Sequence, residues 1–257
     1  MLKLTTWNLL APGYTSNTPY SHIYDRVRAE VDWSVRRGRL RDALRTETAD
    51  ILCVQEVAPD LFDGAEDPLG DGVWQMACAP RPSTHTESHV AVLWRRGKLE
   101  AEPSHGGLEG EFGASLAVRL SCVDSGRSLA LVSVHLRYDR DPSVRLSRLQ
   151  TAIGHLRSVA RADAALVVGD VNFDPVAHPR WPRWRGAGWQ STHPGETIVT
   201  WGVNGRTEKL DAILFRGALS LRHAEPVLRF DPKLGLPSAA LPSDHVPLRA
   251  TFEWGSR

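Results

Sequence analysis

The chain has 257 residues, of which 42% are hydrophobic and 24% charged, and its formal net charge at pH 7 is +1. This composition excludes a disordered or fibrous protein, and the length predicts a single domain over residues 1–257 with a sizeable core. The near-neutral charge gives no overall signal for a protein that binds nucleic acid or membranes.

Short apolar or alternating runs predict that the chain consists mainly of strands. In chain order, the predicted strands are residues 2–7, 50–57, 89–95, 115–123, 128–136, 164–170, 197–202, 209–215 and 245–254. Asn204-Gly205 is a hairpin turn signal, because both residues tolerate a positive φ. Apolar and polar residues alternate strictly from Val246 to Trp254, which predicts a sheet with one covered face.

Two helices are predicted among these strands. Residues 36–48 carry leucines four apart among charged residues, and residues 143–161 carry a continuous apolar stripe at helical spacing. The Gly-rich residues 104–114 and the Pro- and Trp-rich residues 175–195 predict loops. Many strands with few helices between them predict an α+β sandwich, in which two sheets pack face to face and helices lie outside.

Three cysteines, Cys53, Cys78 and Cys122, are odd in number and form no CxxC motif. They predict buried apolar residues in a reducing compartment rather than a disulfide framework or a thiolate zinc site. The first residues alternate like a strand instead of forming the apolar stretch of a signal peptide, and no run of about 18 apolar residues occurs. We therefore expect a cytoplasmic protein that does not enter the membrane.

Polar residues follow or open six of the predicted strands. They are Asn8, Gln55-Glu56, His135, Asp170 with Asn172, Asp211, and Ser243-Asp244-His245. A single Asp or Asn after a strand is usually a turn former, but six such positions on one chain favour a functional site. Carboxylate and amide oxygens suit Mg²⁺ or Mn²⁺, whereas clusters of His and Cys would have indicated zinc. Such a set fits phosphoester hydrolysis, which needs a cation, a base and hydrogen-bond donors.

These positions carry a family resemblance. The matching motifs, in order, are Trp7-Asn8, Gln55-Glu56, His135-Leu136, Gly169-Asp170-x-Asn172, Leu210-Asp211 and Ser243-Asp244-His245. Over residues 7–245 the chain resembles the endonuclease/exonuclease/phosphatase superfamily. The resemblance implies a four-layered α/β sandwich of two mostly antiparallel sheets, with the active site at one edge of the packed sheets.

The resemblance also implies a site for Mg²⁺ or Mn²⁺. Glu56 would be the principal ligand of this metal ion, with Asn8 and Asp244 in or near the metal shell. For Asn8 the alternative is a structural amide beside Glu56.

Catalytic roles follow from the same resemblance. Asp170 would orient or deprotonate the attacking water, and Asn172 would assist it. His245, oriented by Asp211, would donate to the scissile phosphate as negative charge builds up. His135 would contact a phosphate oxygen from the opposite side.

Flanking residues resemble the deadenylase, nocturnin and Angel-type branch of the superfamily. Trp7-Asn8-Leu9-Leu10-Ala11 is similar to the WN-[IV]-L-A of that branch, not to the WN-x-N-G of abasic-site endonucleases. Trp33-Ser34-Val35-Arg36, Ala49 to Val57 and residues 135–150 resemble further segments of the same branch. The chain is shorter than the larger members of that branch and has no leucine-rich repeat. We expect an RNA or nucleotide substrate and a monomer without an evident protein partner.

Three further residues are candidates for binding substrate. Arg137, two residues after His135, would grip a second phosphate, unless it is a solvated charge at the strand end. Trp184 and Arg183 lie in the Trp/Arg loop 180–189, which would stack bases or fold its tryptophans onto the sandwich. The same two interpretations apply to Tyr14, Tyr20 and Tyr24.

The predicted function is a metal-dependent phosphodiesterase or phosphatase acting on RNA 3′ ends or nucleotides, with poly(A), 2′,5′-linked and 2′,3′-cyclic ends all open. The weak net charge favours the alternative of a phosphatase acting on a nucleotide, a phosphoinositide or another small phosphate ester. A DNA endonuclease is a further alternative. The intact set of acidic and histidine residues disfavours an inactive scaffold.

Overall fold

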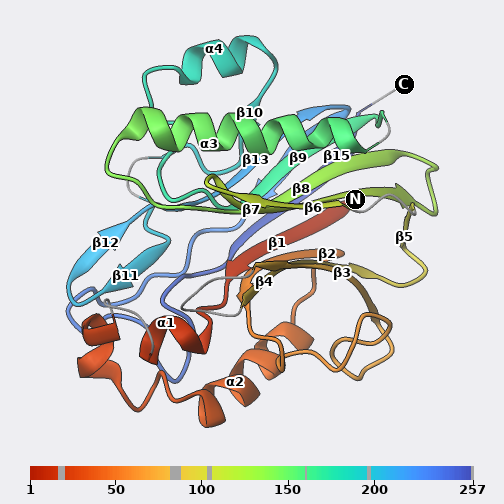
Figure 1. The fold of residues 1–257 in the computed structure, drawn as a ribbon. Coiled ribbons are helices and arrows are strands. Elements are labelled where there is room, and N and C mark those ends of the chain that lie inside the picture. Colours follow the sequence, from red (N-terminus) through yellow and green to blue (C-terminus); the bar gives the residue numbers. More distant parts are fainter. Residues whose placement is uncertain (17–20, 82–87, 103–105, 160, 196–197, 256–257) are drawn as a thin grey trace.

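Two large sheets lie face to face, and helices cover the outer face of each (Figure 1). The computed structural model describes residues 1–16, 21–81, 88–102, 106–159, 161–195 and 198–255. The layers run helix, sheet, sheet, helix, so the predicted four-layered α/β sandwich is confirmed.

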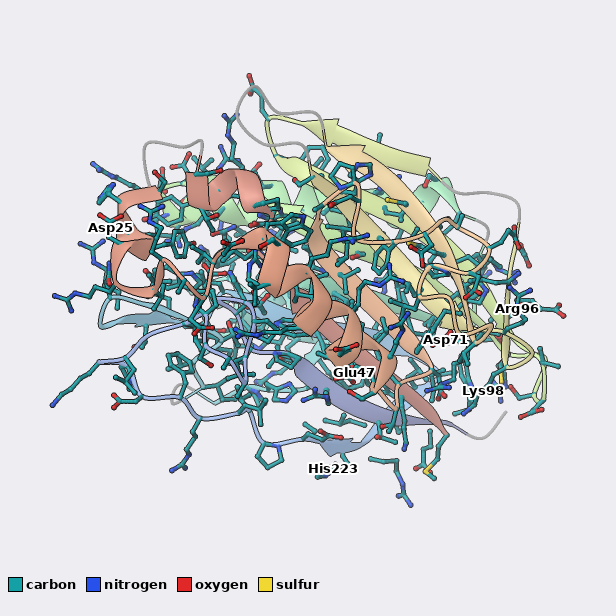
Figure 2. All side chains as sticks on the ribbon, turned by 90° about the horizontal axis from the view of Figure 1, so that it is seen from below. Asp25, Glu47, Asp71, Arg96, Lys98 and His223 are labelled. Atoms are coloured by element: carbon teal, nitrogen blue, oxygen red, sulfur yellow. The ribbon has the colours of Figure 1, made fainter. Side chains whose placement is uncertain are left out.

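The first sheet contains six strands. Across the sheet they are β14 (Leu219–Ala224), β15 (Leu248–Trp254), β1 (Leu2–Asn8), β2 (Ile51–Val57), β4 (Ser88–Arg95) and β3 (Trp74–Arg81). Helix α2 (Trp33–Arg45) packs on its outer face, and α1 (Pro12–Ser16) and the 3₁₀ helix η1 (Ser21–Val27) precede α2. In the view from below, Glu47 lies just past the end of α2 (Figure 2).

The second sheet contains seven strands. They are β10 (Gln190–Ser191), β13 (Asp211–Gly217), β9 (Ala164–Asp170), β8 (Ser128–Leu136), β7 (Gly113–Cys122) and β5 (Leu99–Ala101), with β6 (Gly106–Gly110) also paired to β7. Helix α3 (Pro142–His155), its 3₁₀ continuation η2 (Leu156–Ser158) and helix α4 (Trp181–Gly186) cover the outer face.

The core between the sheets is built from alternate residues of each strand. Leu4, Ile51 and Val92 of the first sheet meet Leu131 and Leu166 of the second, and all five are buried. Alternate side chains of a strand point to opposite faces, so the intervening residues face the helices. Full burial of each such side chain contributes about 1.5–3 kcal/mol to stability.

Strand direction brings four strand ends to one edge of the sandwich. Strands β1 and β2 are parallel, as are β8 and β9, while the other paired strands of the described residues are antiparallel. Across the sheets, β1 contacts β9 and β2 contacts β8. The carboxyl ends of these four strands therefore meet between the sheets.

Both predicted helices are confirmed, with shifted ends. Asp32 and Asp141 precede α2 and α3, and each side chain accepts a hydrogen bond from the N–H two residues later, as N-cap residues do. The predicted turn at Asn204-Gly205 is also confirmed, because it joins β11 (Trp201–Val203) to β12 (Arg206–Glu208). Both turn residues have a positive φ.

The two predicted loops are partly wrong. Within residues 104–114 the structure has strand β6, and a Cβ on Gly107 would lie 2.6 Å from the Cβ of Ala79 in β3. Glycine here permits close approach of the two sheets and does not mark a loop. Residues 175–195 contain α4 and β10, whose short lengths gave no clear periodicity.

The cysteines are free thiols, but they are not all buried. Cys53 is buried, Cys122 half-buried and Cys78 exposed on the edge strand β3, so the prediction of three buried residues is wrong for Cys78. Among the described residues, no helix is long and apolar enough to cross a lipid bilayer.

Candidate active site

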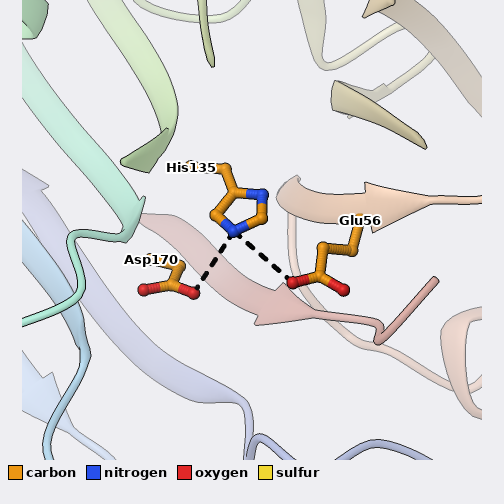
Figure 3. A group of neighbouring side chains, drawn as sticks. All are labelled: Glu56, His135 and Asp170. Carbon is orange, nitrogen blue, oxygen red and sulfur yellow. Dashed lines mark ion pairs between the residues drawn. The ribbon is translucent and has the colours of Figure 1, made fainter. Parts of the chain in front are cut away.

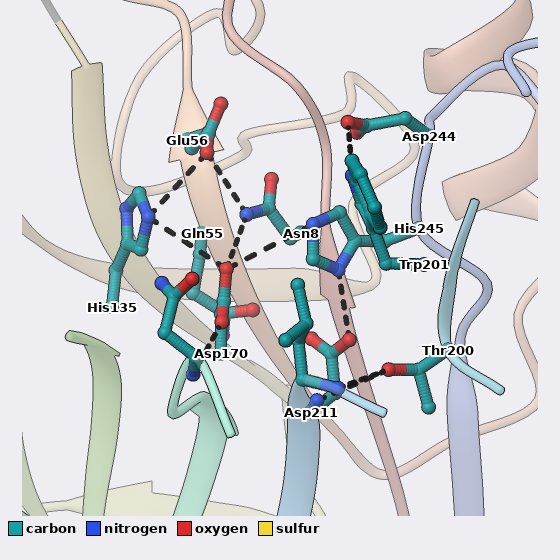
Figure 4. Close-up of polar contacts among 12 residues, drawn as sticks. Asn8, Gln55, Glu56, His135, Asp170, Thr200, Trp201, Asp211, Asp244 and His245 are labelled. Carbon is teal, nitrogen blue, oxygen red and sulfur yellow. Dashed lines mark hydrogen bonds and ion pairs between the residues drawn. The ribbon is translucent and has the colours of Figure 1, made fainter. Parts of the chain in front are cut away.

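The polar residues at the strand ends lie together between the two sheets (Figure 4). Register pairs Asn8 with Gln55 in the first sheet, and pairs Asp170 with both His135 and Asp211 in the second. The buried side chains of the group are Asn8, Gln55, Glu56, His135, Asp170, Asp211, Asp244 and His245. The fold thus brings the polar residues predicted from the sequence into one cluster.

Asn8 lies at the centre of the cluster and is fully buried. Its Nδ2 donates to Glu56 Oε1 and to Asp170 Oδ2, in both cases over 3.0 Å. Its Oδ1 accepts the N–H of Leu10 at 3.0 Å. With these contacts Asn8 acts as an amide that spaces two carboxylates, the alternative considered for it, and its role as a metal ligand stays a prediction.

A candidate metal site consists of Glu56, His135 and Asp170 (Figure 3). One ligand atom from each residue lies within 4.8 Å of the others. His135 Nε2 lies 3.4 Å from Glu56 Oε1 and 3.7 Å from Asp170 Oδ2. The second oxygen of Glu56 accepts the N–H of Ala11 at 3.0 Å, which fixes the carboxylate. The geometry thus adds to the candidate ligands both His135, predicted to contact phosphate, and Asp170, predicted to act on the water.

Burial and the repulsion between neighbouring carboxylates disfavour negative charge in this cluster. Burial raises the pKa of Glu56, and the nearby Asp244 raises it further. Burial also raises the pKa of Asp170, to about 7, and the charges of Asp211 and Glu56 act in the same direction while His245 opposes them. A divalent cation stabilises such buried carboxylates, so the group of two carboxylates and one imidazole fits a metal ion.

Asp211 and His245 form a buried pair on the other side of Asp170. His245 Nδ1 donates to Asp211 Oδ2 at 2.8 Å, and Nε2 lies 3.8 Å from Asp170 Oδ2. Burial alone would lower the pKa of His245, but Asp211, Asp244 and Asp170 together raise it to about 10. The Oγ1 of Thr200 accepts the backbone N–H of Asp211 at 3.1 Å. The imidazolium is therefore held charged, with Nε2 turned toward the acidic cluster.

Asn172 fixes Asp170 through its backbone. The N–H of Asn172 donates to Asp170 Oδ1 at 2.9 Å, while its side-chain Nδ2 donates to the carbonyl of Leu136 at 2.7 Å. Asp170 is thus held from both sides, by Asn8 at one oxygen and by Asn172 at the other. The catalytic assistance by Asn172 stays a prediction.

Unusual backbone conformations concentrate at the site. Leu10, Glu56 and Asn172 have φ values of 55°, 53° and 59°, in the left-handed region that non-glycine residues rarely occupy. Gly169, before Asp170, has φ 133°, and a Cβ there would lie 2.2 Å from the carbonyl oxygen of Val134. The glycine of the Gly-Asp-x-Asn motif is therefore required by the close approach of β8.

Asp244 belongs to the buried cluster but lies outside the candidate metal group. Its Oδ2 accepts the hydroxyl of Tyr24 and the indole N–H of Trp201, each at 2.8 Å, whereas its buried Oδ1 has no hydrogen-bond partner among the described residues. Tyr24 is buried and its hydroxyl holds Asp244, whereas Tyr20 lies outside the described residues. Trp201 and Thr200 were not predicted, because no motif or spacing distinguishes them.

The three predicted substrate-binding residues do not lie together in the structure. Trp184 is only 8% exposed and packs with α3 against the outer face of the second sheet. The prediction that its ring stacks on a base is therefore wrong, and the alternative, a tryptophan folded onto the sandwich, holds. Its helix α4 lies on that outer side (Figure 1), where Arg183 is exposed and is not brought to the cluster. Arg137 is exposed directly after β8, and its phosphate contact stays a prediction.

A cavity of about 640 Å³ lies near Asn172, but no residue of the buried cluster lines it. Phe173, which follows Asn172, lines it together with Arg145, His178 and Lys209. The guanidinium of Arg145 lies 5.7 Å from the ring centroid of Phe173. Asp174 and Glu208 also line the cavity, and Lys209 pairs with Asp174 at 3.0 Å. Arg145, which donates to the carbonyl of Asn172, is thus the cationic side chain beside Phe173.

Comparison with known proteins agrees with this architecture. A model of the Endonuclease/Exonuclease/phosphatase family matches residues 5–245. The CCR4-Not complex 3′-5′-exoribonuclease subunit Ccr4 of Neurospora crassa is 28% identical over 86 residues, a match that spans 33% of this chain and 10% of that protein.

Two solved structures share the fold. ANGEL2, a 2′,3′-cyclic phosphatase, superposes with a TM-score of 0.80 at 18% identity, covering 98% of this chain and 94% of that one. The human nocturnin catalytic domain superposes with a TM-score of 0.74 at 20% identity, covering 98% and 93%. At these identities the likeness concerns the fold.

Proposed function

Because this chain belongs to the endonuclease/exonuclease/phosphatase family, it is a phosphoric ester hydrolase, and we propose that it acts on RNA 3′ ends or nucleotides with Mg²⁺ or Mn²⁺. The observation that carries the proposal is one buried cluster that joins Glu56, His135 and Asp170 to the Asp211–His245 pair. Such a cluster contains the ligands, base and donor that phosphoester hydrolysis requires.

Glu56 would hold the metal ion, with His135 and Asp170 as its neighbours. A bound divalent cation would neutralise charge on the non-bridging oxygens of the phosphate. Ala11 fixes one oxygen of Glu56 through its N–H, and Asn8 fixes the other. Glu56 is therefore held in place before any ligand binds.

Asp170 and His245 would carry the proton and charge movements. Asp170 is oriented by Asn8 and by the N–H of Asn172, which suits a carboxylate that aligns or deprotonates a water molecule. His245 is kept protonated by Asp211 and would donate through Nε2 to a phosphate oxygen as negative charge develops.

Two features support an RNA or nucleotide substrate. The proteins similar to this chain include a 3′-5′-exoribonuclease subunit and a 2′,3′-cyclic phosphatase. The cavity near Asn172 places the ring of Phe173 beside the guanidinium of Arg145, and such groups bind bases and phosphates. The weak net charge of +1 is the observation that favours a small phosphate ester instead.

A substrate panel tests the proposal. Turnover of oligo(A), RNA with a 2′,3′-cyclic phosphate, abasic DNA and a phosphoinositide would be compared with Mg²⁺ or Mn²⁺ present. We expect at least one of the two RNA substrates to show a kcat/KM at least about tenfold above both others. Cleavage of abasic DNA or phosphoinositide without RNA turnover would contradict the RNA proposal, although the protein would remain a hydrolase.

Removal of the metal should abolish activity on every substrate. Exhaustive chelation leaves the carboxylates without their cation, and added Mg²⁺ or Mn²⁺ should restore turnover. Glu56→Gln should weaken metal affinity at least about tenfold, measured by calorimetric titration, because it removes a charged ligand.

Glu47→Gln is the matched control for this variant. Glu47 is equally buried, but it binds Thr5 and Arg249, away from the cluster. Its substitution should reduce stability and leave metal affinity unchanged. Full activity of the chelated wild-type protein would refute the metal requirement.

A further inference from the structure

Arg36 is a fully buried arginine in the first turn of α2, on the outer side of the six-stranded sheet. Its hydrogen bonds in the described part of the chain all go to backbone carbonyls. Nη1 donates to Leu9 at 2.7 Å and to Pro242 at 3.2 Å, and Nη2 donates to Leu10. One planar guanidinium therefore joins the segment after β1 to the segment before β15.

The first of these segments holds the acidic cluster. The N–H of Leu10 donates to Asn8 Oδ1, and the N–H of Ala11 donates to Glu56 Oε2. Arg36 binds the carbonyls of Leu9 and Leu10, which belong to the same two peptide groups as these N–H groups. A shift of residues 9–11 would thus displace both Asn8 and Glu56.

The second segment holds the histidine. Pro242 precedes Ser243, whose Oγ donates to the carbonyl of Asn8 at 2.6 Å and accepts the N–H of His245 at 3.2 Å. Arg36 thus connects the segment after β1 to the segment before β15 through Pro242, and Ser243 connects the same two segments nearer the active site. Two bridges hold Asn8 and His245 in a fixed relation.

Stability alone does not account for a cation at this position. Burial lowers the pKa of Arg36 to about 10, although Asp244 and Glu56 act in the opposite direction, so the group stays protonated at neutral pH. A buried charge that contacts carbonyls instead of a carboxylate is costly, and an apolar side chain of similar size would often stabilise the fold more. Buried polar or charged residues of this kind are expected where the geometry of a functional site must be maintained.

We propose that Arg36 is a positioning residue of the active site, which sets Asn8 and Glu56 relative to Asp244 and His245 by clamping residues 9–10 to Pro242. The ring of Trp33, whose centroid is 5.1 Å from the guanidinium carbon, holds the clamp from the side of the helix. The catalytic consequence rests on the proposed function, whereas the clamp itself can be measured without substrate.

Arg36→Lys tests the clamp, because it keeps the charge but replaces a planar fork by a single ammonium group. Arg95→Lys is the matched control. Arg95 also donates to two backbone carbonyls, those of Ala49 and Glu47, and lies over an indole, that of Trp74, at the opposite end of the sheet. Amide hydrogen exchange and thermal unfolding would be measured for both variants, with kcat and KM on the best substrate.

In Arg36→Lys, we expect the amides of Leu10, Ala11 and His245 to exchange at least about tenfold faster, because charge-assisted bonds that hold both segments are lost. kcat should fall at least about tenfold with KM nearly unchanged, since the residues displaced act on the transition state. Arg95→Lys, at a half-buried side chain, should lower the unfolding temperature but leave these amides and kcat unchanged.

Several outcomes would overturn the proposal. Unchanged exchange in the folded Arg36→Lys protein, or faster exchange in only one of the two segments, would show that no clamp exists. Faster exchange in both segments with wild-type kcat would show a clamp without a positioning role. If Arg36→Lys does not fold, Trp33→Leu should give the same exchange pattern more weakly, and its absence there would refute the clamp. A wild-type protein inactive on every substrate would refute the proposed function and leave the exchange result to judge the clamp.

Discussion

Asp170→Asn should lower kcat by at least about 100-fold, with a smaller change in KM, because a positioned general base contributes about 10²- to 10⁴-fold. The amide can still accept a hydrogen bond from Asn172 or Asn8, so the side chain keeps its place while it loses the ability to take a proton. Steady-state kinetics on the best substrate of the panel measures the loss.

The same substitution should leave the fold intact. Burial raises the pKa of Asp170, so a neutral amide at this buried position should cost the fold little. We expect the free energy of unfolding, from urea titration, to fall by no more than about 1 kcal/mol. Asp50→Asn is a control, because Asp50 is equally buried but pairs with Lys98 at the opposite end of β2. Near-wild-type turnover of folded Asp170→Asn would refute its assigned role.

The site could be predicted because its residues occupy strand ends. A strand end is visible in the sequence as the point where an apolar run stops, as in Val54-Gln55-Glu56 or Val168-Gly169-Asp170. The parallel pairing of β1 with β2 and of β8 with β9 then converts these positions into neighbours. The fold class follows from the same pattern, because mostly strand-forming runs with two amphipathic helices permit few architectures.

What the sequence could not supply depends on long-range contacts. Trp184 and its neighbouring arginines have the composition of a nucleic-acid-binding loop, and only the packing of α4 against the second sheet shows that its indole is buried. Trp201 supports Asp244 from 43 positions away, and Arg36 reaches Pro242 across 206 positions. No local period encodes such contacts. The edge strand β6 was likewise hidden, since its glycines read locally as a loop.

His245→Ala should lower kcat by at least about 100-fold, with a smaller effect on KM, because a protonated donor aimed at the developing charge acts mainly in the transition state. Asp211→Asn should produce a smaller fall in kcat, since His245 remains but loses the partner that orients Nδ1 and favours its charge. The double variant should be little worse than His245→Ala alone, because the two residues act as one unit.

A matched control separates this effect from the loss of a buried imidazole. His193 is buried like His245 and is also hydrogen-bonded through Nδ1, in its case with the hydroxyl of Thr192. His193→Ala should reduce the free energy of unfolding by about 1–3 kcal/mol through its unsatisfied neighbours, and leave kcat within about threefold of wild type. If the folded His245→Ala and His193→Ala variants lost kcat equally, the imidazole of His245 would support the structure only. If His245→Ala lost activity and Asp211→Asn did not, His245 would act without the orientation that the 2.8 Å contact provides.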